Sequence, residues 1–130
     1  MSDSRFKELV DEALESIPSR FRDAMQNIAI VIEQEPTAAQ LESVDLDPAE
    51  DSLLGLYEGT PLPERGWAHG NVLPDKITLF QRVIEEESAD EDDLVVAIGE
   101  TLIHEIGHYF GLSEEEIEEI EERYWRGEEE

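Results

Sequence analysis

Residues 88–111 predict the longest regular element of the chain. Ser88 and Glu91 fit a capping box, in which a serine and an acidic residue three positions later satisfy the first N–H groups of a helix. The apolar stretch that follows, DDLVVAIGETLIHEIGHYF, continues as a helix to about Phe110. Gly111 then suits the left-handed position that commonly ends a helix. We therefore predict one long helix that stops at this glycine.

Shorter apolar segments before this helix predict a small sheet. Apolar residues at helical spacing first predict a helix over residues 5–17, which Pro18 ends. Three apolar stretches then predict strands over residues 27–34, 53–59 and 76–84. The first of these is short and β-branched, which is typical of a strand buried on both faces.

Two loops and a final helix complete the outline. The polar segment 35–52 predicts a loop with one short helical turn, and 60–75 predicts a loop of a length that is often functional. Ser113 and Glu116 make a second capping box, which opens the last helix. Its apolar positions are Ile117, Ile120 and Tyr124. This order of elements predicts an α/β or α+β fold with a small sheet.

The size and the segments of the chain favour one domain in the cytoplasm. With 130 residues, we expect a single domain over residues 1–126 and a disordered acidic tail at 127–130. No apolar run reaches the roughly 20 residues of a membrane span, and the first residues do not resemble a signal peptide. We therefore expect a soluble cytoplasmic protein, with a monomer as the default state.

The net charge of −26 comes from 35 acidic residues against 9 lysines and arginines. Such a surface repels nucleic acid phosphates and anionic membranes, so we expect no binding to either. The charge indicates a solvated surface or, alternatively, a surface that docks a basic partner or one that mimics a nucleic acid backbone. It does not by itself identify a function.

His104 and His108 stand one helical turn apart on the same face, so both imidazoles can reach one ion. Glu105 can lie beside that ion without ligating it and take a proton from metal-bound water. This is the HExxH arrangement of zinc peptidases. The competing interpretation is a pair of histidines packed at a helix surface beside a solvated glutamate. Two histidines at this spacing, with the glutamate between them, favour a zinc site.

A catalytic zinc usually has three protein ligands, and the sequence continues as HExxHxxGxxE. In the related pattern HExxHxxGxxH, the glycine lets the chain turn and brings the last residue in as the third ligand. Gly111 and Glu114 occupy these two positions. Because a carboxylate is a competent zinc ligand, Glu114 is the predicted third ligand.

Other assignments of the third ligand stay open. Ser113 fits an N-cap, and acidic residues are favoured in a first helical turn by the helix dipole, so Glu114 is explained without a metal. Glu115 or Glu118 could take its place, and His69 could reach the site from the long loop. Two imidazoles and a carboxylate also suit iron, manganese or cobalt.

The chain resembles the small bacterial zincin-like metallopeptidase domains. The resemblance lies in LLGLYEGTPL (53–62), LPDKITLF (73–80) and TLIHEIGHYFGLSEEEI (101–117). It implies an α+β minimal zincin-like fold, with a small mixed sheet packed on the HExxH helix, an edge strand over the cleft and flanking terminal helices. It also implies zinc at His104 and His108 and an acidic ligand at Glu114, where aspartate is the commoner residue. No Met-turn follows the motif.

These observations lead to the hypothesis of a zinc-dependent peptidase that hydrolyses a peptide or protein substrate. Glu105 would be the general base for a metal-activated water. An extended peptide would add to the edge of the sheet at Lys76, Ile77, Thr78, Leu79 and Phe80. The loop 60–75 would border the cleft, and Tyr109 would either stabilise an oxyanion or pack in the core.

Two alternatives from other classes remain. The chain could be a metal-binding module that acts through a protein partner without cleaving peptides, although such a module has no use for Glu105. It could also be an acidic interaction protein that binds no metal. The metal content of the purified protein separates the last alternative from the other two.

Overall fold

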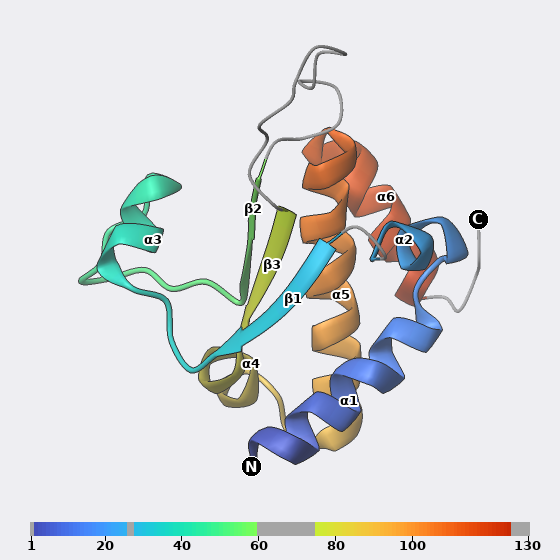
Figure 1. Cartoon of the computed structure of the whole chain (residues 1–130), viewed down its shortest axis with the longest axis horizontal. Helices are drawn as coiled ribbons and strands as arrows, with labels where there is room; N and C mark the ends of the chain where they lie inside the picture. Colours follow the sequence, from blue (N-terminus) through green and yellow to red (C-terminus); the bar gives the residue numbers. More distant parts are fainter. Residues whose placement is uncertain (1, 26–27, 60–74, 126–130) are drawn as a thin grey trace.

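A three-stranded mixed sheet packs against one long helix (Figure 1). The computed structural model describes residues 2–25, 28–59 and 75–125. The predicted tail at 127–130 and the predicted loop at 60–75, apart from Asp75, lie outside these residues. The strands are β1 (Ile28–Glu33), β2 (Gly55–Glu58) and β3 (Asp75–Phe80), in the order β1-β3-β2. β1 runs parallel to β3, and β2 runs antiparallel to it.

The three predicted strands are confirmed, each somewhat shorter than predicted. β1 is an edge strand among the described residues, and only Ile28 in it is buried, while Ala29 is exposed and the others are half-buried. The expectation of a strand buried on both faces was therefore wrong. The strand that has this character is β3, because it lies between two others and five of its six residues are buried.

The third predicted strand ends at Phe80, and the predicted strand residues 81–84 instead belong to the helix α4 (Gln81–Glu86). Residue pairing with β1 ends where Phe80 meets Glu33, and just beyond it the N–H of Arg82 still donates to the carbonyl of Gln34 at 3.1 Å. The chain then continues as a helix that buries Ile84 completely. The apolar spacing alone did not distinguish the two outcomes.

The N-terminal helix is confirmed as α1 (Asp3–Ser16), and Ser2 caps it by accepting a hydrogen bond of 3.1 Å from the N–H of Arg5. A second helix that the sequence did not predict, α2 (Ser19–Ala24), follows at once. Pro18 ends the first helix and starts the second, since its carbonyl accepts from the N–H groups of Phe21 and Arg22.

The short helical turn expected within residues 35–52 is α3 (Ala38–Ser43). Thr37 and Gln40 form a full capping box there, each side chain accepting from the backbone N–H of the other residue. α3 lies on the side of the sheet away from α5 (Figure 1). It therefore stands apart from the histidines.

The long helix is α5 (Glu91–Phe110), and it ends as predicted at Gly111, whose φ of 74° is left-handed. Its N-cap is Asp90, however, and the predicted capping role of Ser88 was wrong. The hydroxyl of Ser88 instead donates to the carbonyl of Ile84 at 2.8 Å, at the end of α4. The last helix, α6 (Glu114–Trp125), follows a short turn.

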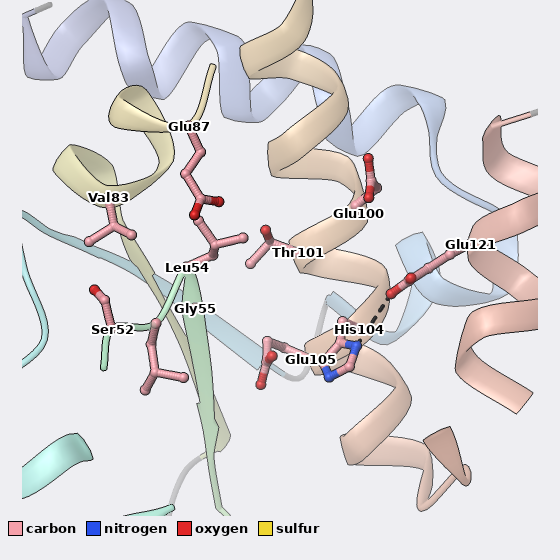
Figure 2. Close-up of a pocket in the computed structure, with 11 residues that line it drawn as sticks. Ser52, Leu54, Gly55, Val83, Glu87, Glu100, Thr101, His104, Glu105 and Glu121 are labelled. Carbon is pink, nitrogen blue, oxygen red and sulfur yellow. Dashed lines mark hydrogen bonds and ion pairs between the residues drawn. The ribbon is translucent and has the colours of Figure 1, made fainter. Parts of the chain in front are cut away.

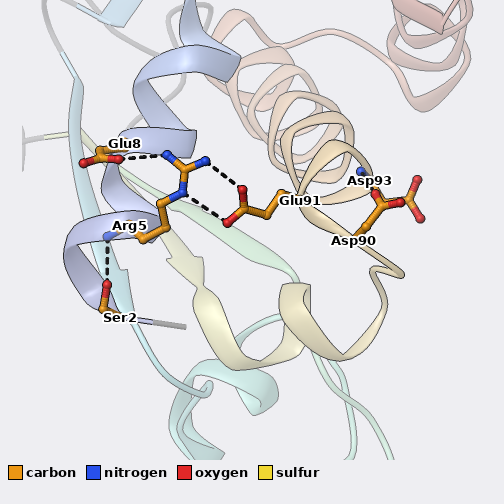
Figure 3. A network of polar contacts seen from close by, with 6 residues as sticks. All are labelled: Ser2, Arg5, Glu8, Asp90, Glu91 and Asp93. Atoms are coloured by element: carbon orange, nitrogen blue, oxygen red, sulfur yellow. Dashed lines mark hydrogen bonds and ion pairs between the residues drawn. The ribbon is translucent and has the colours of Figure 1, made fainter.

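The main core lies between α1, α5 and the sheet. Its fully buried members include Phe6, Ile17, Phe21, Ile77, Leu79, Ile84, Ile98, Leu102, Ile103 and Ile106. At the start of α5, the Arg5 guanidinium bonds both carboxylate oxygens of Glu91, at 2.7 and 3.1 Å, and also reaches Glu8 at 2.8 Å (Figure 3). These contacts attach α1 to the end of α5 that is remote from the histidines.

The architecture confirms the predicted fold class, an α+β fold in which a small mixed sheet packs on the helix that carries the histidines, with flanking helices at both ends. Across the ranges that the structure covers, no helix has both the length and the apolar character needed to cross a membrane.

Candidate metal centre

α5 presents His104 and His108 side by side, with ring centroids 4.9 Å apart and ring planes at 43°. The spacing of one turn places them on the same helical face, as the sequence predicted. Glu105 completes a group in which one ligand atom from each of the three residues lies within 4.8 Å of the others. A single ion can therefore contact both imidazoles while a carboxylate stands next to it.

Glu114 approaches the two histidines from the first turn of α6. One carboxylate oxygen lies 3.6 Å from Nε2 of His104, and the other lies 3.5 Å from Nε2 of His108. The left-handed turn at Gly111 makes this possible, because it reverses the chain directly after α5. The structure thus brings the predicted third ligand to the two predicted histidine ligands.

The capping function at the start of α6 belongs to other residues. The hydroxyl of Ser113 accepts from the N–H of Glu116 at 3.1 Å, and the Glu116 carboxylate accepts from the N–H of Ser113 at 3.0 Å. This capping box was predicted and is confirmed. The side chain of Glu114 takes no part in this capping box, although its place in the first turn of α6 is still favoured by the helix dipole.

The other suggested ligands do not reach the histidines in the described part of the chain. Glu115 and Glu118 are exposed, and neither lies within ion-pair distance of an imidazole. His69 falls in the segment 60–74, outside the described residues.

The residues around the two imidazoles fit zinc in their chemistry, since imidazole nitrogens and carboxylate oxygens are zinc ligands. Two atoms bound at roughly 2.0–2.2 Å to a tetrahedral ion lie about 3.3–3.6 Å apart. Each oxygen of Glu114 lies at such a separation from one imidazole, Oε2 from Nε2 of His104 and Oε1 from Nε2 of His108. Nε2 of His108 is buried and has no hydrogen-bond partner. A buried polar atom without a partner costs free energy, and a metal ion at this position would remove that cost.

The two histidines differ in their electrostatic surroundings. The pKa of His104 is raised, chiefly by a hydrogen bond from its Nδ1 to the carboxylate of Glu121 at 3.3 Å. The pKa of His108 is lowered, because burial and the neighbouring His104 both disfavour its charged form. A neutral imidazole is the form that binds a metal, so burial prepares His108 for this role.

The side chain of Glu105 extends from α5 towards β2. Burial raises the pKa of Glu105 to about 7, although His104 and a backbone hydrogen bond oppose this shift. That bond comes from the N–H of Tyr57, which donates to the Glu105 carboxylate at 2.9 Å. In the metal-free chain, the carboxyl group therefore changes its charge near neutral pH.

A pocket of about 550 Å³ opens beside His104 and Glu105, between β2, α4 and α5 (Figure 2). Its apolar wall includes Leu54 and Val83. Its polar wall carries four glutamates: Glu87, Glu100, Glu105 and Glu121. The described lining contains no lysine or arginine, so the pocket is strongly acidic.

The predicted peptide-binding segment does not lie at a sheet edge. β3, which contains Lys76, Ile77, Thr78, Leu79 and Phe80, is the central strand and pairs on both sides. Its backbone groups are used within the sheet, and all of these side chains except Lys76 are buried. Strand addition to β3 is therefore excluded, and this correction leaves β2 as the strand next to Glu105.

Tyr109 had two alternative roles in the sequence interpretation, and Glu121 had none. The ring of Tyr109 is only 5% exposed and packs edge-on against Tyr57 and Phe110, which favours the core role over the oxyanion role. Glu121 was not predicted at all. It lies seven residues after Glu114, two turns along the same face of α6, and this spacing is the signal that could have revealed it.

The fold and the site together define an α+β scaffold with a candidate metal site of the HExxH type. A family profile described as zincin-like metallopeptidase matches residues 25–124. The chain therefore belongs to the zincin-like metallopeptidase family. A search of the curated proteins gives no match to the chain.

Proposed function

We propose that this protein is a zinc-dependent peptidase in which His104, His108 and Glu114 hold the metal and Glu105 is the general base. Membership of the family supports the class of reaction. The observation that carries the proposal is the spacing of the Glu114 carboxylate oxygens, 3.6 Å from His104 and 3.5 Å from His108. Location in the cytoplasm and a monomeric state are further parts of the proposal.

Bound zinc supplies a Lewis acid that lowers the pKa of water and polarises a carbonyl group. The chain itself supplies the movement of the proton. Glu105 takes a proton from the attacking water onto its carboxylate and later gives it to the leaving amine. Its hydrogen bond to the N–H of Tyr57 holds the carboxylate in the lining of the acidic pocket.

We propose that β2, in place of β3, provides the edge to which a peptide adds. Backbone groups in an antiparallel pair face the partner at alternate residues. The carbonyl of Leu54 accepts from the N–H of Phe80, so the backbone groups of Leu54 and of every second residue after it face β3. The backbone groups of Gly55 and Tyr57 face away from β3, and the N–H of Tyr57 donates outward to Glu105. These outward groups lie next to the proposed base, where a scissile bond has to be.

The acidic lining of the pocket favours peptides with basic or neutral side chains near the scissile bond. Glu87 and Glu121 repel an acidic side chain and attract a basic one. The apolar wall of Leu54 and Val83 suits the methylene groups of a long basic side chain.

The metal content and the hydrolysis of peptides by Glu105→Gln test this function. We expect the variant to bind zinc like the unchanged protein and to lose hydrolysis, because glutamine cannot accept the proton. Glu115→Gln removes one exposed carboxylate from α6 and should leave both properties unchanged. Persistent hydrolysis in Glu105→Gln would contradict the role of the base.

The same assays separate the alternatives. Stoichiometric zinc in the unchanged protein without hydrolysis of any peptide in a diverse library would favour the non-catalytic metal-binding module. The absence of zinc after purification in a zinc-containing buffer would contradict the metal centre itself and favour the acidic interaction protein.

A further inference from the structure

One helix places a carboxylate beside each nitrogen of the His104 ring. Nδ1 of His104 donates to Oε1 of Glu121 at 3.3 Å, and Nε2 lies 3.6 Å from Oε2 of Glu114. The two glutamates stand seven residues apart on α6, so they occupy the same face two turns apart. Figure 2 shows Glu121 reaching from α6 to the imidazole on α5.

Close packing of α6 on α5 sets this alignment. A Cβ atom added to Gly107 would lie 2.6 Å from Cγ1 of Ile117, and one added to Gly99 would collide with the hydroxyl of Tyr124. The two helices therefore run antiparallel with these pairs in contact, and Glu121 and His104 fall between them. The Tyr124 hydroxyl also lies 3.2 Å from the hydroxyl of Ser16, which attaches the far end of α6 to α1.

Glu121 also differs from the other glutamates of α6 in its burial. Its side chain is 22% exposed, compared with 67% for Glu114, and it is the one glutamate of that helix that is not exposed. Partial burial of a carboxylate is costly unless a hydrogen bond compensates, and here the imidazole of His104 provides it. A solvated acidic face therefore explains the other glutamates but not this one.

From this alignment we infer that Glu121 is a positioning residue for His104 and that metal binding is coupled to the docking of α6 on α5. The carboxylate fixes the proton of the ring on Nδ1, which leaves the lone pair of Nε2 directed towards Glu114 and His108. Because Glu114 belongs to the same helix, displacement of α6 removes both carboxylates from His104 together. The inference rests on the proposed metal site and assigns a role to α6 as a whole.

Zinc affinity tests the positioning role. We expect Glu121→Ala to weaken zinc binding, measured by competition with a chelator, by about 10- to 100-fold. Glu122→Ala removes the neighbouring charge, which is exposed, and should change the affinity little. Equal losses in the two variants would show an effect of net charge and overturn the inference, as would an unchanged affinity in Glu121→Ala.

The tautomer of His104 gives a readout that needs no metal. In the metal-free protein at alkaline pH, where both rings are neutral, nitrogen NMR should show His104 protonated on Nδ1. Glu121→Ala should shift His104 towards the Nε2–H tautomer and leave His108 unchanged. The same tautomer of His104 in both proteins would overturn the inference even if zinc binding were confirmed. Conversely, a shift without any zinc binding would support the contact and contradict the proposed function alone.

Coupling to α6 has its own readout. Hydrogen exchange of the α6 amides should slow when zinc is added to the unchanged protein, and should slow much less in Glu121→Ala. Exchange in α3, which is remote from the site, serves as the internal reference. Zinc binding that leaves α6 exchange unchanged would overturn the coupling.

Discussion

At the scale of single residues, the pKa of Glu105 is set by burial of its carboxyl group and by two neighbours, His104 and the N–H of Tyr57. The enclosure between α5 and β2 raises its pKa to about 7 from 4.5, and the His104 ring and the Tyr57 N–H limit the rise. These opposing effects place the titration of the carboxyl group near neutrality in the metal-free protein. The sequence identified the residue, and the surroundings determine its pKa.

The burial of Glu105 predicts a pH dependence of the stability of the metal-free protein. Because the pKa is higher in the folded than in the unfolded state, unfolding releases a proton between pH 4.5 and about 7, so stability falls as pH rises through this window. The shift corresponds to roughly 3 kcal/mol. Glu105→Gln should therefore be more stable than the unchanged protein above pH 7 but not below pH 4.5.

Urea unfolding with a chelator present, at pH values on either side of this window, measures the difference. The comparison between the two proteins cancels the pH dependence that other acidic groups contribute. The same difference in the free energy of unfolding at both pH values would show that the Glu105 carboxyl group is not responsible.

Glu114 and Ser113 lie next to each other and should have separable effects. Ser113→Ala removes the cap of α6 and should lower the free energy of unfolding by about 1 kcal/mol. Glu114→Ala should leave the stability of the metal-free protein nearly unchanged, because its side chain is 67% exposed, but should weaken zinc binding strongly. Unfolding and zinc titration of both variants measure this, and unchanged zinc binding in Glu114→Ala would require another third ligand.

At the scale of elements, the contact of α5 with α6 depends on glycine at its closest point. Ile117 is fully buried against Gly107, so Gly107→Ala inserts a methyl group where there is no space. Alanine favours a helix by about 1 kcal/mol over glycine, yet overpacking costs about 1–3 kcal/mol. We expect a net loss of stability in urea unfolding, together with weaker zinc binding.

Gly99→Ala is the matched control for this substitution. Its added methyl group meets the hydroxyl and the ring of Tyr124, which lies in the last turn of α6. The end of a helix shifts at a lower cost than its packed first turns. The loss of stability should therefore be smaller than in Gly107→Ala. A gain of stability in Gly107→Ala would show that α6 is not held at this distance.

The elements also show what local sequence can predict. α1, α5 and α6 were predicted because their apolar spacing and end residues are local signals. The change from β3 to α4 at Phe80 was missed, since it falls where the residue pairing with β1 ends. Asp90 replaces Ser88 as the cap of α5 because the Ser88 hydroxyl bonds back to α4. The first miss reflects pairing with a distant segment, whereas the second reflects a competing hydrogen bond to a residue only four positions earlier.

At the scale of the whole molecule, the net charge of −26 opposes the compact state. Salt screens this repulsion, so we expect the thermal midpoint of the metal-free protein to rise from low to high sodium chloride. Calorimetry in the presence of a chelator measures it. Choline chloride is the control, because an equal rise with both salts indicates screening, whereas a rise with sodium alone would indicate specific binding.

The sequence by itself determined the long helix, its end at Gly111, the histidine pair with Glu105 and the position of Glu114. These features follow from spacing within one stretch of about 30 residues, where helical geometry fixes which side chains share a face. The family resemblance, carried by three short segments, added the fold class, which the structure and the family profile confirm.

Only the tertiary structure decided which strand is central, which edge faces the base and which glutamate holds His104. β3 was expected at an edge and is enclosed by two partners, and Glu121 was not recognised among the many acidic residues of α6. The physical reason is common to these cases. Strand order and helix packing arise from contacts between segments far apart in the chain, and no local period of apolar or charged residues encodes them.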